Sequence, residues 1–190
     1  MRIVRNLTAA AVVATAAFTV APSVAGAEER VCRGSLGRVT VDDLRVPANA
    51  TCNLHQTQVR GNIVVERGAT LSARTIRVVG NVQAEGAARV DLSALSDVGG
   101  SVQVEQGGSS IVRDTRVRGD IQFEENRREV RSESNAVGGN IQVMKNRGGA
   151  HISGNRVDGN LQCKENTPAP RGFDNTVRGN MEDQCRRLVK

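Results

Sequence analysis

The chain has 190 residues, a formal net charge of +6, no tryptophan or tyrosine and three phenylalanines. Proteins that bind single-stranded nucleic acid use basic grooves with aromatic stacking platforms. Here the basic residues are spread along the chain and the platforms are missing, so we exclude nucleic acid as a partner. A core without large aromatic side chains must be thin and filled by small aliphatic ones, which indicates stacked layers.

The N-terminus has the pattern of a secretory signal peptide. Two arginines in the first six residues precede an apolar stretch over residues 7–21, and small residues occupy 25–27, the order that a signal peptidase recognises. We expect cleavage between Ala27 and Glu28, which leaves a mature chain of 163 residues with net charge +4. No later segment approaches the ~20 apolar residues of a transmembrane helix. The prediction is a secreted, extracellular protein, released into the medium or associated with the cell wall.

A period of about 20 residues runs through the mature chain. Each repeat has a glycine with a valine two residues before it and an apolar residue two after it, and these glycines are Gly61, Gly80, Gly100, Gly119, Gly139, Gly159 and Gly179. Polar residues separate the apolar ones, chiefly Gln83, Gln103, Gln122, Gln142 and Gln162. Alternation with period two is typical of a strand with one buried face.

A fixed period of this length predicts a β-solenoid. Each unit of a repeat protein buries its apolar face by stacking on its neighbours, and helical repeats need ~33 residues or more. We therefore predict an all-β fold, a single-stranded parallel β-solenoid of about eight coils with ~20 residues in each, its handedness left open. Val117, Val137 and Val157 should form a column. We place N-terminal capping coils in 28–58, regular coils in 59–182 and a C-terminal cap in 183–190.

The glycine of each repeat and the residue after it are expected to form the corner between two coil faces. Glycine reaches backbone angles closed to other residues, and an Asn, Asp or Ser follows it in every repeat. Such side chains can hydrogen-bond along the stack as asparagine ladders do. Two further ladders are predicted, one from Asn126, Asn146 and Asn166 and one from Asn135, Asn155 and Asn175. We expect the inward residues of the less regular second half of each coil to be Leu71, Val90, Ile111, Val130, Ile152 and Phe173.

The four cysteines fit the period as two disulfides. Cys32 and Cys52 are 20 residues apart, one coil, and Cys163 and Cys185 are 22 apart. Neighbouring coils bring Cα atoms within the 4.4–6.8 Å that a disulfide needs, whereas a bridge between the two pairs would span at least five coils. We predict the bridges Cys32–Cys52 and Cys163–Cys185, one at each end of the rod, where each closes a loop worth about 3 kcal/mol.

The sequence contains no catalytic constellation. His55 and His151 are the only histidines and lie about five coils apart, and no nucleophile motif or phosphate-binding loop occurs. We therefore predict no enzyme, no catalytic residues and no cofactor. Glu66, Glu85, Glu105 and Glu124 each stand five residues after a coil glycine. Stacked carboxylates repel one another, so they form either a stripe that a divalent cation would bridge or a set of side chains splayed into water; we expect no metal.

The run V-x-G-N-(I/L)-Q-(V/C)-x-x-N, which ends in NLQCKENTPAPRGFDNTVRGNMEDQC, resembles the tail of small secreted β-helix proteins of actinobacteria. That resemblance covers most of the mature chain and implies no particular activity. The V-x-G-(D/N)-I element also resembles the coils of bactofilins, which are β-helical scaffold proteins that polymerise. The second resemblance implies end-to-end assembly.

These patterns predict a secreted, non-catalytic structural or adhesion module that contacts a cell-wall polymer or a surface protein. The glutamine row would be its contact surface. Two alternatives are a carbohydrate-active parallel β-helix enzyme and a scaffold that forms head-to-tail filaments. For the oligomeric state we predict a monomer or a weak end-to-end oligomer.

Overall fold

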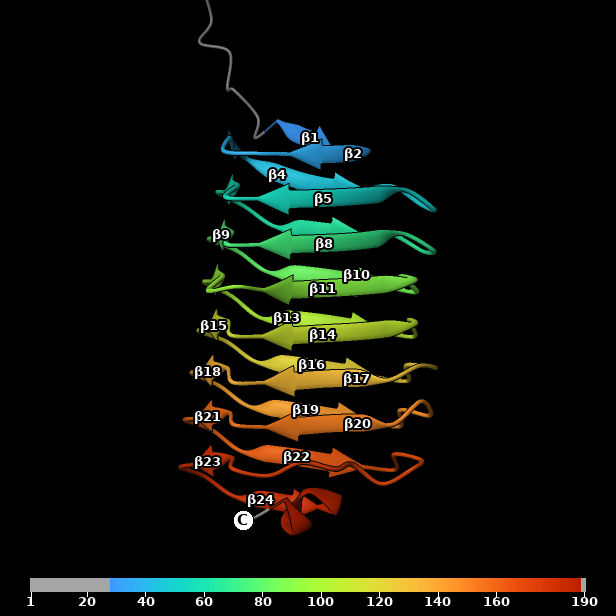
Figure 1. Cartoon of the computed structure of the whole chain (residues 1–190), viewed down its shortest axis with the longest axis vertical. Coiled ribbons are helices and arrows are strands. Elements are labelled where there is room, and N and C mark those ends of the chain that lie inside the picture. Colours follow the sequence, from blue (N-terminus) through green and yellow to red (C-terminus); the bar gives the residue numbers. More distant parts are fainter. Residues whose placement is uncertain (1–27, 189–190) are drawn as a thin grey trace, which may run out of the picture.

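The computed structural model describes residues 28–188, which form a rod of stacked coils (Figure 1). The predicted signal peptide, residues 1–27, lies outside the described residues, as do the last two residues of the predicted C-terminal cap. Every strand pairs in parallel with the strand of the next coil, in three sheets. The fold prediction is confirmed: the protein is an all-β parallel β-solenoid of about eight coils.

A complete coil contributes one strand to each of the three sheets, in the order C, A, B, whereas the coils at the two ends of the described chain lack a strand in sheet C or in sheet B. Sheet A contains β1 (Glu29–Val31), β4 (Asp43–Val46), β7 (Ile63–Val65), β10 (Val82–Glu85), β13 (Val102–Glu105), β16 (Ile121–Glu124), β19 (Ile141–Met144), β22 (Leu161–Lys164) and β24 (Met181–Asp183). Sheet B contains β2 (Gly34–Leu36), β5 (Thr51–His55), β8 (Thr70–Arg74), β11 (Arg89–Ser93), β14 (Ser109–Arg113), β17 (Val130–Glu133) and β20 (Ala150–Ser153). Sheet C contains the two-residue strands β3 (Thr40–Val41), β6 (Gln58–Val59), β9 (Arg77–Val78), β12 (Asp97–Val98), β15 (Arg116–Val117), β18 (Ala136–Val137), β21 (Arg156–Val157) and β23 (Thr176–Val177).

A single 3-10 helix, η1 (Gln184–Arg187), follows the last strand of the described chain. Within residues 28–188 no helix has the length and apolar character needed to cross a membrane.

The register of the sheets follows the sequence period. Val117 pairs with Val137, and Val137 pairs with Val157, so the predicted valine column exists in sheet C. The two apolar positions after each glycine form two more columns in sheet A, which begin with Ile63 and Val65. All three columns are buried. Most of the buried residues are valine, isoleucine, leucine and alanine, with a smaller set of asparagine, serine, threonine and cysteine among them, and Phe123 is the largest fully buried side chain.

Sheet B departs from the predicted inward set at two positions. Ser110, not Ile111, pairs with Val90 and Val130 and is buried, so Ile111 points outward. Phe173 is also outward, with 56% of its surface exposed. The sequence Ser109-Ser110-Ile111-Val112 does not fix which face is buried, and the coils on either side impose their own register on it. The cost is visible, because the buried Ser110 hydroxyl has no hydrogen-bond partner among the described residues.

The coil glycines are needed for close packing and not for an unusual backbone angle. None of the seven has a positive φ, which corrects the expectation from the sequence. A Cβ on Gly80 would lie 2.6 Å from the carbonyl oxygen of Gly61 and 3.0 Å from Cγ of Asn62. Such a contact leaves no room for any side chain. The glycine column therefore lets successive coils stack at the C–A corner.

The polar residues after the coil glycines form the first predicted ladder. In each coil the side-chain oxygen accepts the backbone N–H of its counterpart in the next coil, as Asn62 Oδ1 does from Asn81 N over 2.9 Å and Asn81 Oδ1 from Ser101 N over 2.8 Å. Asp43 starts the series by accepting from Asn62 N over 2.7 Å. The same bond continues as far as Asn160 and Asn180. These bonds satisfy corner N–H groups that the strand ladders leave out.

The other two predicted ladders are present and lie inside the rod. Asn126, Asn146 and Asn155 are at most 1% exposed. Asn146 illustrates the pattern: its Oδ1 accepts from both the backbone N and the Nδ2 of Asn126, over 3.0 and 2.9 Å, and its Nδ2 donates to the carbonyl of Phe123 over 2.9 Å. Its Nδ2 also donates to Oδ1 of Asn166 over 3.0 Å. The amide thus has its hydrogen bonds satisfied within the core, as a buried polar group must.

The two disulfides join the predicted pairs at the two ends of the rod. Cys32 is bonded to Cys52 with a Cα–Cα distance of 5.6 Å, and Cys163 to Cys185 with one of 5.0 Å. Cys185 lies in η1, so this bridge holds the helix against β22 at the C-terminal end. The N-terminal end is more open, since Val31 and Val39 are 43% and 44% exposed.

Candidate functional site

The outer face of sheet A carries the predicted glutamine row. Successive side chains of a strand point to opposite faces of the sheet. The glutamines point outward because the apolar residues on either side of them in the same strands point into the core. Gln83 Nε2 donates to Gln103 Oε1 over 3.2 Å, and Gln103 Nε2 donates to Gln122 Oε1 over 3.3 Å. Gln142 makes the same bond with Gln162, which in turn donates to Glu182 over 2.9 Å. Among the described residues no hydrogen bond joins Gln122 to Gln142, so the row consists of two hydrogen-bonded segments, Gln83–Gln103–Gln122 and Gln142–Gln162–Glu182, that lie in line along the rod.

Each amide of the row keeps hydrogen-bonding capacity for a ligand. A glutamine amide has two N–H donors and an oxygen with two lone pairs, and a bond to each neighbour uses about one donor and one lone pair. The remaining groups face solvent at intervals of about 4.8 Å, the spacing between strands. A row of this kind can bind the hydroxyl or amide groups of an extended polymer.

The predicted glutamate stripe runs beside the glutamine row. Glu85 pairs with Glu105, and Glu105 with Glu124, after which Met144 and Lys164 continue the column. The structure thus brings the carboxylates into one line. Residues 28–188 contain no group of three or more His, Cys, Asp or Glu side chains arranged to hold a metal ion, so the geometry gives the cation-bridged alternative no support.

The two ends of the glutamate stripe are neutralised by protein groups. At Glu66 the backbone N–H of Ala48 donates over 2.8 Å and Arg45 Nη1 over 3.1 Å, and both bonds lower the pKa of the Glu66 carboxyl below its ordinary value. Glu124 forms an ion pair with Lys145 over 3.3 Å. Hydrogen bonds from Lys145 to Glu124 and then to Glu125 raise the pKa of the ammonium group. The negative charge of the stripe is therefore partly balanced by protein groups at its two ends.

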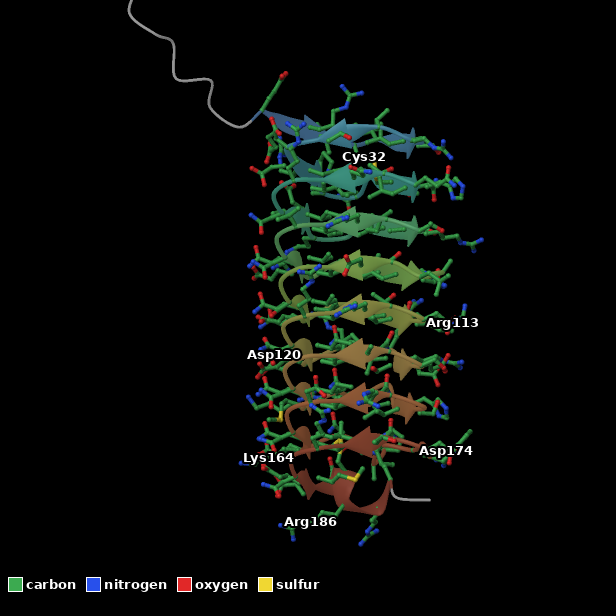
Figure 2. The ribbon with its side chains drawn as sticks, turned by 90° about the vertical axis from the view of Figure 1, so that its left-hand side faces the viewer. Cys32, Arg113, Asp120, Lys164, Asp174 and Arg186 are labelled. Atoms are coloured by element: carbon green, nitrogen blue, oxygen red, sulfur yellow. A yellow bond between two sulfur atoms is a disulfide. The ribbon has the colours of Figure 1, made fainter. Side chains whose placement is uncertain are left out.

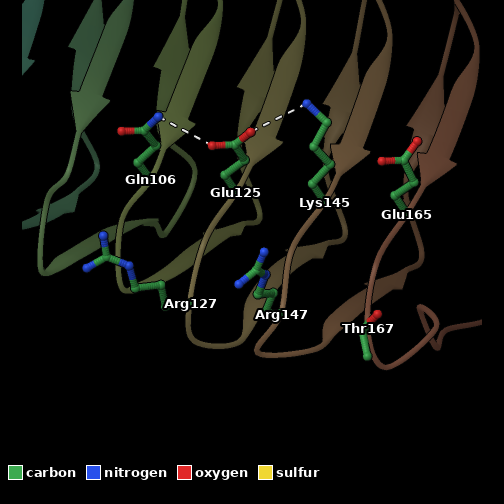
Figure 3. Close-up of a pocket in the computed structure, with 7 residues that line it drawn as sticks. All are labelled: Gln106, Glu125, Arg127, Lys145, Arg147, Glu165 and Thr167. Atoms are coloured by element: carbon green, nitrogen blue, oxygen red, sulfur yellow. Dashed lines mark hydrogen bonds and ion pairs between the residues drawn. The ribbon is translucent and has the colours of Figure 1, made fainter.

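A shallow groove lies at the corner where the chain passes from sheet A to sheet B (Figure 3). Gln106, Glu125, Lys145 and Glu165 line one side of it, and Arg127, Arg147 and Thr167 the other. Gln106 Nε2 donates to Glu125 over 3.3 Å and Lys145 Nζ to the same carboxylate over 3.4 Å. Acidic and basic side chains alternate on the first side, and the second side carries two arginines, so the groove suits a polar ligand better than an apolar one.

The residues on the first side of the groove have a left-handed backbone conformation that the sequence did not predict. Gln106, Glu125, Lys145 and Glu165 have φ values of 52–58°. A second column of positive φ lies at the corner between sheets B and C and includes Ala94, Asp114, Ser134 and Gly154. The left-handed turns of the solenoid thus fall at polar residues, mostly not at glycine. Asp114 is of a type that tolerates this region, but the residues on the first side of the groove are Gln, Glu and Lys, whose recurrence at one offset does not indicate a left-handed turn.

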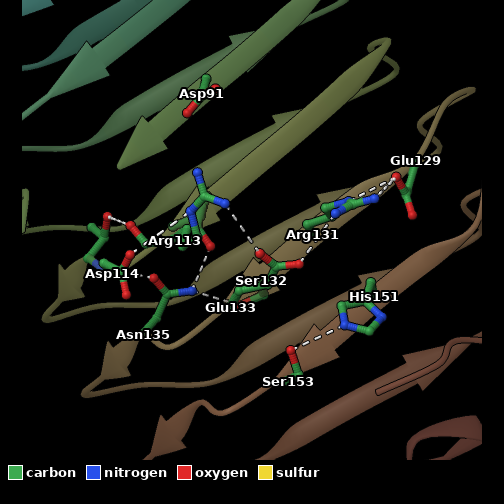
Figure 4. A network of polar contacts seen from close by, with 12 residues as sticks. Asp91, Arg113, Asp114, Glu129, Arg131, Ser132, Glu133, Asn135, His151 and Ser153 are labelled. Carbon is green, nitrogen blue, oxygen red and sulfur yellow. Dashed lines mark hydrogen bonds and ion pairs between the residues drawn. The ribbon is translucent and has the colours of Figure 1, made fainter. Parts of the chain in front are cut away.

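The outer face of sheet B carries ion pairs and a contact between a histidine and a serine (Figure 4). Arg131 contacts Glu129 over 2.8 Å and Glu133 over 3.6 Å. His151 Nε2 lies 3.2 Å from Ser153 Oγ, and its ring meets Phe173 edge-on. No carboxylate within residues 28–188 hydrogen-bonds to His151, so the pair lacks the group that orients a histidine base. His55 lies in β5 and His151 in β20, and the two do not meet.

Comparisons of this chain with protein-family models, with curated proteins and with solved structures find no match. The function must therefore be argued from the residues of the rod itself. Polar and charged side chains cover the outside of the rod along its length (Figure 2).

Proposed function

We propose that the protein is an extracellular, non-catalytic binding module, and that the glutamine row on sheet A is its contact surface. The ligand class is an extended, hydroxyl-rich polymer such as a cell-wall polysaccharide, lying along the rod. The two disulfides, which persist in oxidising compartments, and the predicted signal peptide support an extracellular location.

The observation that carries the proposal is the order of the row. Bonds between neighbouring amides within each of the two segments hold side chains that otherwise have several free rotamers, so less conformational entropy is lost when a ligand binds. The repeat distance also matters, because five successive coils present a glutamine amide at the same position of sheet A. A polymer of repeating units can then gain from many weak bonds in register.

The test is binding of the mature protein, residues 28–190, to insoluble polysaccharide fractions of cell walls. The triple variant Q103M/Q122M/Q142M keeps side-chain length and removes the amides, and we expect it to lose about tenfold or more in affinity, as the loss of several hydrogen bonds implies. The control variant R74M/R113M changes exposed polar side chains on sheet B and should bind like the parent protein. Circular dichroism checks that each variant keeps its strands.

Unchanged binding by the triple variant would exclude sheet A as the contact face. Release of soluble sugar fragments in the same assay would favour the alternative of a carbohydrate-active enzyme. The filament alternative stays a prediction of the sequence.

A further inference from the structure

One column of outward side chains on sheet C alternates between arginine and shorter residues. Read along the rod, the column is Arg77, Asp97, Arg116, Ala136 and Arg156. Neighbouring strands are ~4.8 Å apart, so successive arginines of the column are separated by about 10 Å. The residue between two arginines therefore determines what occupies the space between their guanidinium groups.

Between Arg77 and Arg116 the column carries an acidic residue. Asp97 occupies the intervening position of the column, and Arg118 of the next coil reaches back to it with Nη2 3.6 Å from Asp97 Oδ2. The other carboxylate oxygen, Asp97 Oδ1, is buried. Among the described residues the ion pair of Asp97 is with Arg118, and neither Arg77 nor Arg116 pairs with it.

Between Arg116 and Arg156 the corresponding anion is missing. Ala136 stands where β12 has Asp97, and a shallow notch opens there between Arg116 and Arg118 on one side and Arg156 on the other. Asp158 also borders the notch, but its carboxylate is paired with Arg178 over 3.3 Å. Among the described residues, no carboxylate lies within ion-pair distance of Arg116 or Arg156.

Close packing between coils explains why residue 138 is a glycine but not why residue 136 is an alanine. Gly138 is required by the fold, since a Cβ there would lie 3.2 Å from the carbonyl carbon of Arg118. Ala136 is exposed, and the equivalent positions of other coils carry Asp, Arg or Thr. A larger side chain would therefore fit at Ala136. The small residue leaves room between two guanidinium groups that are free to converge on a bound group.

We propose that this notch binds a phosphate or sulfate ester group of an external molecule, held between the guanidinium groups of Arg116 and Arg156. The planar donors of arginine match the oxygens of tetrahedral oxyanions and bind them in pairs. The bound anion would lie beside Ala136, at the column position where Asp97 provides a carboxylate two coils away. This site lies on sheet C and does not depend on the binding proposed for sheet A.

The first experiment titrates the labelled mature protein with inorganic phosphate, and separately with sulfate, at low ionic strength. NMR amide shifts should saturate and should be largest at Arg116, Ala136, Val137 and Arg156. The variant A136D supplies the missing carboxylate and should weaken binding about tenfold or more, because an internal anion competes for both guanidinium groups. The variant R156Q should do the same by removing one of them.

Arg131→Gln is the matched control, because Arg131 is an exposed arginine already paired with Glu129. It should bind phosphate like the parent protein. If phosphate shifts the amides of all arginine-bearing coils equally, or if A136D binds as well as the parent, the notch is not a site.

A second experiment identifies the source of the ester group. The mature protein is passed over immobilised polyphosphate, dextran sulfate and neutral dextran. Retention on polyphosphate alone assigns a phosphate-bearing ligand, and retention on dextran sulfate alone a sulfated one; in either case A136D should elute earlier than the parent. Equal elution of A136D and the parent from both charged polymers would overturn the proposal.

Discussion

The two halves of the rod build the same corners from different chemistry. At the corner between sheets A and B, the N-terminal half has Ala69, Ala87 and Gly107, where the C-terminal half has Asn126, Asn146 and Asn166. At the corner between sheets B and C, Thr57, Ile76, Ser96 and Thr115 precede Asn135, Asn155 and Asn175. The backbone bonds between coils are the same in both halves, since Gly108 N donates to Ala87 O as Arg147 N does to Asn126 O.

The comparison shows that these corners can form without an asparagine ladder, and that a ladder adds side-chain hydrogen bonds to them. A small apolar residue fills the space and leaves nothing unsatisfied. An asparagine fills the same space but depends on its neighbours above and below, because each side chain needs partners in adjacent coils. The C-terminal half should therefore be more cooperative than the N-terminal half, and single substitutions within it should cost more.

Removal of the middle ladder member is the strongest test of this difference. Asn146→Ala leaves the backbone N and Nδ2 of Asn126 without their acceptor and the carbonyl of Phe123 without its donor. We expect a loss of about 4 kcal/mol in the free energy of unfolding, since each buried unsatisfied group costs about 1–3 kcal/mol. The measurement is chemical denaturation.

The matched control for that variant is Ala87→Gly, at the equivalent corner of the N-terminal half. It removes one methyl group and adds backbone freedom, so it should cost about 1 kcal/mol. Equal losses in the two variants would show that the ladder adds no cooperativity.

The disulfides give a second, smaller test, because the C-terminal bridge supports a ladder and the N-terminal bridge does not. Cys163–Cys185 holds η1, whose residue Gln184 accepts from the backbone N of Asn166 over 2.9 Å and so ends the ladder. Replacing both cysteines of this pair by serine should cost about 3 kcal/mol in chain entropy. It should also speed amide hydrogen exchange at Asn166 and Asn146.

The N-terminal pair provides the comparison. The variant C32S/C52S removes a bridge that closes a loop of similar length, so it should lose a similar free energy of unfolding, about 3 kcal/mol. Its faster exchange should stay within β1, β2 and β5, because no buried asparagine ladder begins there. Exchange that spreads equally far from both ends would contradict the proposed difference between the halves.

Much of this structure follows from the sequence because one period governs it. The valine at each sheet C position, the two apolar positions after each glycine and both disulfide pairs depend only on residue n lying next to residue n+20. The sequence also predicted the ladders, since Asn126, Asn146 and Asn166 recur in register with the core. The glutamine row of the candidate site follows from the same alternation.

Three features of the structure could not be predicted from the repeat period of about 20 residues. Ile111 is outward because the neighbouring coils set the register of β14, whatever its own apolar residues favour. The role of the coil glycines depends on the distance to the coil beneath. The notch at Ala136 depends on which side chains flank it across two coils. Each of these is a property of packing between coils, and one repeat examined alone does not contain it.

The left-handed corner between sheets B and C offers the smallest test, and it probes both halves with a matched pair. Ala94 and Gly154 each follow a sheet B strand directly, with φ of 59° and 64°, and the corner of Ala94 has one additional residue, Leu95, with φ of 61°. A Cβ at Gly154 would meet nothing closer than Ser134 Oγ at 3.4 Å, so strain from φ is the only structural cost of Gly154→Ala. That cost should be about 1 kcal/mol, because a left-handed conformation is unfavourable for an L-residue by about 1–2 kcal/mol and the loss of glycine flexibility offsets part of it. Ala94→Gly should raise stability by up to about 1 kcal/mol for the same reason. Thermal unfolding measures both; if Gly154→Ala stabilises the protein, the corner is not strained and the sequence has simply placed alanine and glycine there interchangeably.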